Sequence, residues 1–190
     1  MIKFIVGLGN PGPRYAETRH NAGAWFIEAL PSQYRLNLRL DKKFHLEWAE
    51  LPCASHKVFI GKPITFMNES GLAVAAFAQF YQIHPSEILV VHDELDFQAG
   101  EIKLKIGGGH GGHNGLRDIL NRLGSADFYR LRVGIGHPGQ REQVVSYVLH
   151  PPILDEKIEI DRALYRAMKV LPEILAGDFS KAMKTLHTEA

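Results

Sequence analysis

Six glycines fall within nine residues, from Gly107 to Gly115, and form the densest special region of this 190-residue sequence. Such a loop gives up side-chain packing and backbone order, which a folded chain accepts where its backbone must approach another group closely. The loop lies between a lysine-bearing strand and a helix start, where unpaired N–H groups attract anions or polarised carbonyls. No Gly-Lys-Ser/Thr follows and no acid lies suitably downstream, which excludes a Walker loop and a dinucleotide fingerprint. A mobile, hairpin-like connection is the alternative to a binding loop.

Histidines and one carboxylate offer acid–base or metal chemistry. His20 stands at the start of a predicted helix, and Asp93 ends a predicted central strand, where α/β folds place functional groups. His110 and His113 with Asp93 would suggest a metal site, but the glycine context is loose and the lone Cys53 supplies no soft partner. No Gly-x-Ser-x-Gly elbow is present, so covalent catalysis is unsupported. A His–carboxylate pair that activates water remains.

Three asparagines, Asn10, Asn68 and Asn114, stand at turns or helix starts. Asparagine is a good helix cap, and capping alone explains Asn68 and Asn114 in most proteins. An amide also donates and accepts hydrogen bonds at once, which suits recognition of a peptide or ester carbonyl. The sequence leaves both interpretations open.

The charge of the chain is unevenly distributed. The formal net charge is only +1, yet residues 101–141 contain seven basic and three acidic residues, a local net charge of +4. A basic block inside a nearly neutral chain indicates a local site for a polyanion. A solvated surface patch is the alternative.

The elements that position these residues alternate between strand and helix. Apolar runs predict strands at 2–8, 58–64 and 88–92, and alternating apolar and basic residues predict half-buried strands at 102–106 and 130–135. Helices are expected at 21–30, ended by Pro31, at 69–82, after the glycine loop, at 154–171 and at 180–187. The pattern predicts an α/β fold class, with helices around one sheet that includes an antiparallel portion.

Composition limits the class of protein further. With 45% hydrophobic and 23% charged residues, the chain is neither disordered nor a coiled coil. One cysteine excludes an internal disulfide framework, and no apolar run approaches the roughly 20 residues of a membrane span. The first residues have no signal-peptide anatomy. We expect one soluble, cytoplasmic domain.

Seven segments, in order along the chain, match the motifs of a known family. They are Gly7–Gly12 with Tyr15, Thr18–Gly23, Pro63–Gly71, His92–Asp96, the glycine loop through Arg117, Gly134–Gly139 and Tyr147–Leu149. Together they closely resemble bacterial-type peptidyl-tRNA hydrolase, and the match covers residues 2 to about 150. The remaining residues match only as a helical region of the right length.

The resemblance implies an esterase that cleaves the bond between a peptide and the 3′-terminal ribose of tRNA. It implies a single domain over residues 1–190, with a twisted, mixed sheet between helices and C-terminal helices from about residue 154. It further implies a monomer that needs no metal or organic cofactor, no obligate protein partner and no membrane.

The resemblance also assigns roles to individual residues. His20 becomes the general base and Asp93 its partner, and Asn10 joins them as a catalytic residue. The peptide and the tRNA 3′ end would contact Tyr15, Phe66, Asn68, His113 and Asn114. The tRNA phosphates would contact Lys103, Lys105 and Arg132.

Two alternatives come from other classes of protein. One is a non-catalytic RNA-binding module that uses the basic strands and the glycine loop. The other is a metal-dependent hydrolase. An ester-hydrolysis assay separates the first from an esterase, and chelator sensitivity of the activity reveals the second.

Overall fold

A computed structural model describes residues 1–188 of the chain, which fold around one seven-stranded sheet. The strand order is β2-β3-β4-β1-β5-β7-β6, and the four central strands β4, β1, β5 and β7 run parallel. Antiparallel pairs complete the sheet at both edges. The strands are β1 (Phe4–Gly7), β2 (Arg39–Asp41), β3 (Leu46–Leu51), β4 (Val58–Pro63), β5 (Ile88–Glu94), β6 (Ile102–Ile106) and β7 (Tyr129–Gly134).

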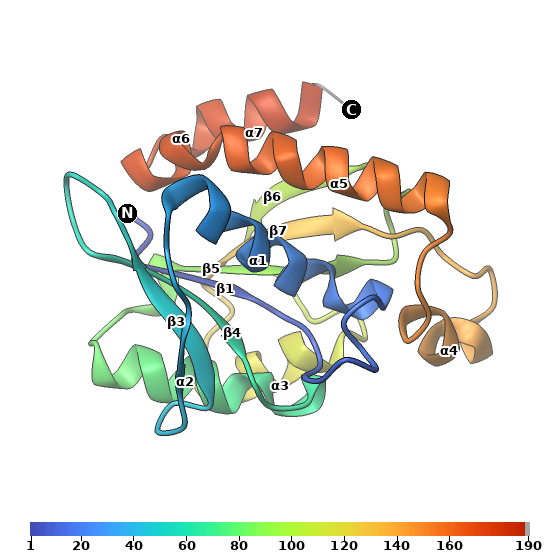
Figure 1. Cartoon of the computed structure of the whole chain (residues 1–190), viewed down its shortest axis with the longest axis horizontal. Coiled ribbons are helices and arrows are strands. Elements are labelled where there is room, and N and C mark those ends of the chain that lie inside the picture. The colour runs from blue at the N-terminus through green and yellow to red at the C-terminus, as the bar shows by residue number, and fades with distance from the viewer. Residues whose placement is uncertain (189–190) are drawn as a thin grey trace.

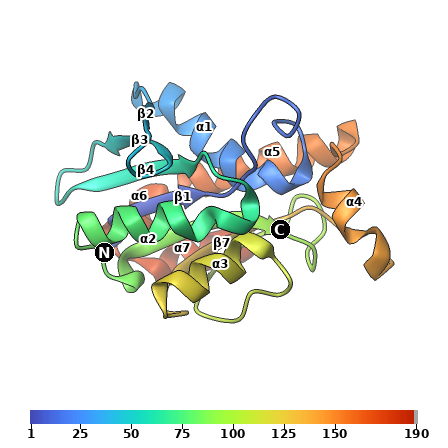
Figure 2. The ribbon, with the colours of Figure 1, turned by 90° about the horizontal axis from the view of Figure 1, so that it is seen from below.

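Helices cover both faces of the sheet (Figures 1 and 2). One face carries α1 (Ala22–Tyr34), α5 (Leu154–Lys169), α6 (Leu171–Ala176) and α7 (Phe179–Thr188). The other carries α2 (Ser70–Phe80) and α3 (Asn114–Leu123), which pack against each other. The short α4 (Val144–Val148) lies beyond the carboxyl ends of the parallel strands (Figure 1). This mixed α/β arrangement confirms the predicted fold class.

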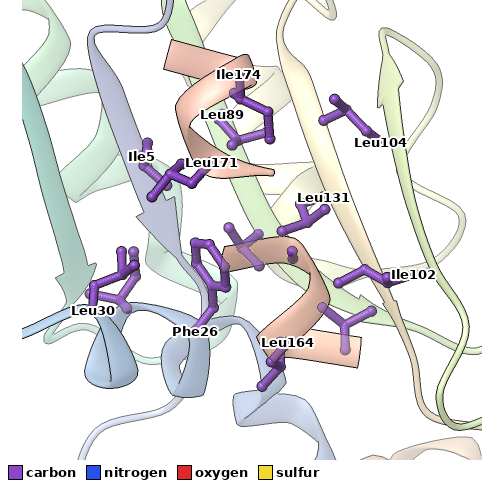
Figure 3. Close-up of a cluster of buried hydrophobic side chains, with 14 of the residues drawn as sticks. Ile5, Phe26, Leu30, Leu89, Ile102, Leu104, Leu131, Leu164, Leu171 and Ile174 are labelled. Atoms are coloured by element: carbon purple, nitrogen blue, oxygen red, sulfur yellow. The ribbon is translucent and has the colours of Figure 1, made fainter. Parts of the chain in front are cut away.

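Each face of the sheet has its own apolar core. Strand residues alternate between the two faces, so Ile5 and Leu89 belong to the core under α1 and α5, while Phe4 and Val90 belong to the core under α2. Figure 3 shows the first core, in which Phe26 lies between the sheet and the C-terminal helices. Each such fully buried side chain contributes about 1.5–3 kcal/mol relative to an exposed one.

Two of the helix boundaries that differ from the sequence prediction involve proline. Pro31 was expected to end the first helix, but α1 continues for one more turn to Tyr34. The helix ends at Arg35, which adopts a left-handed φ of 54° and donates its N–H to the Pro31 carbonyl. The predicted helix over 154–171 ends at Lys169, and α6 begins separately with Pro172 in its first turn, where a missing N–H costs nothing.

The sequence analysis missed β2, β3 and α4. The strand β3 includes charged Glu47 and Glu50, which weakens its apolar pattern, and β2 and α4 have only three and five residues. Within residues 1–188, no helix combines the length and apolar character needed to span a membrane.

Candidate active site

The chemistry-bearing residues gather at the carboxyl ends of the parallel strands, around the side chain of Asp93. Asp93 lies in β5 and is only 4% exposed. His20 Nδ1 lies 3.0 Å from both carboxylate oxygens of Asp93, and His113 Nε2 lies 2.9 Å from Oδ1. One buried carboxylate therefore holds two imidazole rings, whose centroids are 4.9 Å apart.

Close backbone packing brings His20 to Asp93. His20 belongs to a single 3-10 turn (Arg19–Asn21) that leads into α1. A Cβ on Gly7 would lie 2.1 Å from the carbonyl oxygen of Gly23, and a Cβ on Gly23 would lie 2.2 Å from that of Val91. Only glycine at both positions lets the start of α1 rest directly on β1 and β5, which places His20 over the end of β5.

The charges of this cluster make the His20 imidazole a stronger base. Burial lowers the pKa of His20, but the negative charge of Asp93 and its hydrogen bond outweigh burial and raise the pKa above its ordinary 6.5. Burial alone would raise the pKa of Asp93, yet the two histidines hold it well below its ordinary value. Asp93 is therefore ionised, and His20 can donate Nδ1–H to it and keep Nε2 as a proton acceptor.

His113 is the N-terminal cap of α3, a position that the sequence analysis considered for Asn114. Its Nδ1 accepts the N–H of Leu116 at 3.3 Å, so the ring proton resides on Nε2 and is donated to Asp93. The structure places His113 on the Asp93 carboxylate and also in the wall of the cavity described below, so its contact with the substrate stays a prediction. Asn114 Oδ1 instead accepts a hydrogen bond from Arg117 at 3.1 Å, which leaves its amide N–H groups as donors.

The orientation of Asn10 is fixed by its neighbours. Its side-chain oxygen accepts the N–H of Met67 at 2.7 Å, so its amide nitrogen is the group available to a ligand. Its backbone N–H and C=O are both bound by the side chain of Asn21, at 2.8 and 3.0 Å. Asn21 is a supporting residue that sequence reasoning missed.

His92 is a buried imidazole beside the cluster. It is 2% exposed, and its Nδ1–H donates to the backbone carbonyl of Asp93 at 2.7 Å. Burial, with the nearby His113, lowers the pKa of His92 to about 3. It is therefore neutral at physiological pH.

A cavity of about 750 Å³ opens over the cluster. Its walls include Asn10, His20, Asp93 and His113, and the predicted substrate residues Phe66, Asn68 and Asn114. Asn68 lies in a 3-10 turn (Met67–Glu69) without a side-chain cap, so capping explains neither Asn68 nor Asn114.

The far wall of this cavity comes from segments that the sequence analysis did not assign to the site. Val144, Val145 and Val148 of α4 supply an apolar surface, and Leu95 follows β5. A five-residue helix with no charged residue gives little sequence signal. Tyr15 is not among the residues that line the cavity, but its ring contacts that of Phe66 edge to face, with centroids 6.1 Å apart.

The two strands that carry the basic residues are neighbours in the sheet. In the antiparallel pair β6–β7, Lys103 lies opposite Arg132 and Lys105 lies opposite Arg130, so all four side chains share the face opposite the α5 core. Lys105, Arg130 and Arg132 are among the residues that line the cavity, and Lys103 is not.

These cations differ in their partners. Arg132 donates to Glu94 at 2.9 Å, and both Arg132 and Lys103 lie over the ring of Phe97, at 4.4 and 4.5 Å. Lys105 is exposed. Arg130 lies on the same face but is buried, and its guanidinium binds carbonyls of the glycine loop.

The residues that could bind a metal ion in the structure differ from those suggested by the sequence. His20, Asp93 and His113 could together hold a metal ion, since one ligand atom from each lies within 4.8 Å of the others. His110, which the sequence suggested as a ligand, instead accepts the N–H of Gly112 at 3.0 Å.

No serine or cysteine is among the residues of 1–188 that line the cavity, and the proton acceptor that does line it is an imidazole held by a carboxylate. A base of this kind beside amide donors is typical of hydrolases that activate water.

Comparison with known proteins identifies the family of hydrolases that this chain resembles. The family model described as peptidyl-tRNA hydrolase matches residues 4–190. The peptidyl-tRNA hydrolase of Coxiella burnetii (strain CbuG_Q212) is 56% identical over 187 residues, covering 98% of both chains. That of Neisseria meningitidis serogroup C is 53% identical over 188 residues, covering 99% of this chain and 98% of the relative.

A solved structure agrees with these sequence matches. The crystal structure of peptidyl-tRNA hydrolase from Acinetobacter baumannii superposes with a TM-score of 0.95 at 46% identity, and covers 98% of this chain and 95% of that one. The chain belongs to the peptidyl-tRNA hydrolase family. The resemblance drawn from the sequence motifs is confirmed.

Proposed function

We propose that this protein hydrolyses the ester bond between an N-blocked peptide and the 3′-terminal ribose of tRNA, with water activated by His20. The observation that carries the proposal is the pair of 3.0 Å contacts between His20 Nδ1 and the buried Asp93 carboxylate. They leave His20 Nε2 as a base at the cavity that His20 lines.

The reaction then proceeds in two proton transfers. His20 Nε2 takes a proton from water while the water oxygen attacks the ester carbonyl carbon, and Asp93 stabilises the imidazolium that forms. The imidazolium next gives its proton to the ribose 3′-oxygen as the ester C–O bond breaks. The products are tRNA with a free ribose hydroxyl and the carboxylic acid of the peptide, which then loses its proton to solvent as a carboxylate.

The amides of Asn10 and Asn114 suit the negative oxygen of the intermediate or the peptide carbonyls. Their side-chain oxygens are occupied by Met67 and Arg117, so both present N–H donors. A preorganised donor at a developing oxyanion lowers the activation free energy by about 2.7–4 kcal/mol. Asn68 and Phe66, on the same wall, and Tyr15, beside Phe66, complete the proposed site for the peptide and the tRNA 3′ end.

Phosphates of the tRNA body are proposed to contact Lys103, Lys105 and Arg132. Support comes from their common face on β6 and β7 and from the position of Lys105 and Arg132 at the cavity. Phosphate contacts position a nucleic acid without reading its sequence. Because peptidyl-tRNA forms during translation, the proposed substrate also supports a cytoplasmic location for the protein. Monomeric state stays a prediction, which light scattering would test.

Release of a labelled N-acylated amino acid from its tRNA tests the proposed activity. We expect release by the wild-type protein at a rate far above that of buffer, and slower release of the unblocked amino acid. Absence of release would contradict the proposal. Loss of activity with a chelator would favour the metal-dependent alternative, which the proton on His113 Nε2 argues against.

A further inference from the structure

Arg130 is the one residue of the cationic face of β6 and β7 whose side chain is buried; it is 4% exposed. It lies on β7 opposite Lys105 and stacks over the ring of Phe128 at 4.7 Å. A buried guanidinium needs partners, because an unpaired buried charge is costly. The hydrogen-bond partners of the Arg130 guanidinium therefore indicate its function.

Both terminal nitrogens of this guanidinium are bound to the glycine loop. Nη1 donates to the carbonyl of Gly109, and Nη2 donates to the carbonyl of Gly108. The planar fork of arginine matches two adjacent acceptors, a contact that lysine cannot reproduce. The paired end of the fork, which would make a bidentate contact with a phosphate, therefore faces the loop, although each terminal nitrogen keeps a second N–H and Nε has no partner among residues 1–188.

These two hydrogen bonds also orient the rest of the peptide units. In a planar trans peptide the C=O and the following N–H point in opposite directions. With the carbonyls of Gly108 and Gly109 turned to Arg130, the N–H groups of Gly109 and His110 point away from it. Gly109 and His110 both line the cavity, so the loop holds two neighbouring donors in a fixed orientation there.

The loop needs such an anchor because its glycines restrict the backbone very little. Gly107 and Gly108 have φ of 70° and 103°, and Gly111 and Gly112 have 56° and 83°, which glycine adopts with little steric penalty. Four residues beyond Gly109, the same loop delivers His113 to Asp93. A shift of the loop would therefore move the support of Asp93.

We propose that Arg130 is a positioning residue for catalysis, which holds the glycine loop against β7 so that its N–H donors and His113 are set for the ester end of the substrate. It is not a ligand of the tRNA phosphates. The proposal rests on the proposed hydrolysis of peptidyl-tRNA and adds a function for a residue outside the catalytic cluster.

The test compares Arg130→Lys and Arg130→Gln with wild type on two substrates. One is N-acylated aminoacyl-tRNA, and the other is the same N-acylated amino acid esterified to the 3′-hydroxyl of adenosine, which has no phosphates. Arg162→Gln is the matched control, because Arg162 is exposed on α5 and pairs with Glu159 one turn away. Deuterium uptake of residues 107–113 reports on the loop directly.

We expect both Arg130 variants to lower kcat/KM by about 10- to 100-fold on both substrates, the scale of a displacement near 1 Å. The salt dependence of KM should stay that of wild type, and uptake in the loop should rise. The control should match wild type throughout.

Three results would overturn the proposal. A normal rate on the adenosine ester with a shallower salt dependence on tRNA would make Arg130 a phosphate ligand. Wild-type kinetics in both variants would remove any role, and global unfolding of both, seen by circular dichroism, would assign Arg130 to fold stability alone. Failure of the proposed function is distinct, because wild type would then release nothing from either substrate.

Discussion

Replacing Asp93 by asparagine removes the charge that holds His20 while keeping nearly the same shape. The carboxylate oxygens lie 3.0 Å from His20 Nδ1, and the pair is buried. At this separation and an effective dielectric constant of about 20, the attraction between Asp93 and the His20 imidazolium is about 5 kcal/mol. The amide still accepts one hydrogen bond, which retains part of this energy. We therefore expect Asp93→Asn to lower kcat by about 10²–10⁴-fold.

The same substitution should also change the pH dependence, in a direction that the structure determines. Activity requires neutral His20, so it falls as pH drops through the pKa of His20. In wild type the charge of Asp93 raises that pKa; in Asp93→Asn only burial remains, and burial lowers it. The acidic limb of the kcat/KM profile should therefore move to lower pH.

The assay is release of the N-acylated amino acid from tRNA between pH 5 and 9. Asp161→Asn is the control, since Asp161 is an exposed residue of α5 that pairs with Lys157. An Asp93→Asn protein with less than a tenfold loss, and with its acidic limb at the wild-type pH, would refute the electrostatic coupling of Asp93 and His20.

Three further predictions concern substrate binding and stability. Lys105→Ala and Arg132→Ala should each raise KM for acylated tRNA and leave kcat nearly unchanged. Each should also make the slope of log KM against log salt concentration shallower by somewhat under one unit. A KM and a slope equal to those of wild type would show that this face does not contact the tRNA. Asn10→Asp should raise activity on unblocked aminoacyl-tRNA relative to blocked, because a negative charge at the cavity attracts the free ammonium; an unchanged ratio would remove Asn10 from discrimination. Gly23→Ala should lower the free energy of unfolding by about 1–3 kcal/mol, because the new Cβ would lie 2.2 Å from a β5 carbonyl oxygen. Urea titration measures this change, and wild-type stability would contradict the tight packing of α1 on the sheet.

The parallel strands and the glycine loop were predictable because their signals are local. The strand at 88–92 is apolar on both faces, and the apolar spacing after the loop marks α3. Short elements without a strong pattern, β2 and α4, were not predictable. The continuation of α1 beyond Pro31 depends on the packing of α1 against the sheet, which local sequence patterns do not describe.

Pairing of His20 with Asp93 came from the family resemblance, because 73 residues separate them and no spacing rule connects them. Tertiary structure alone shows that His113 shares this carboxylate and that Asn10 presents its nitrogen. The alternation of strand residues correctly placed Lys103 with Lys105 on one face of β6, and Arg130 with Arg132 on one face of β7. It could not show that Arg130, on the same face, turns inward to the glycine loop, because burial there depends on where the loop folds.

Single-turnover hydrolysis by His20→Ala is the measurement that most directly tests the role of His20 as the base. His84→Gln, a change at an exposed histidine away from the cavity, is the control. With saturating N-acylated aminoacyl-tRNA, we predict a rate about 10²–10⁴-fold below wild type, the usual loss for a positioned proton acceptor, while affinity for the tRNA stays near wild type. A His20→Ala protein that releases the acylated amino acid at nearly the wild-type rate would contradict the mechanism.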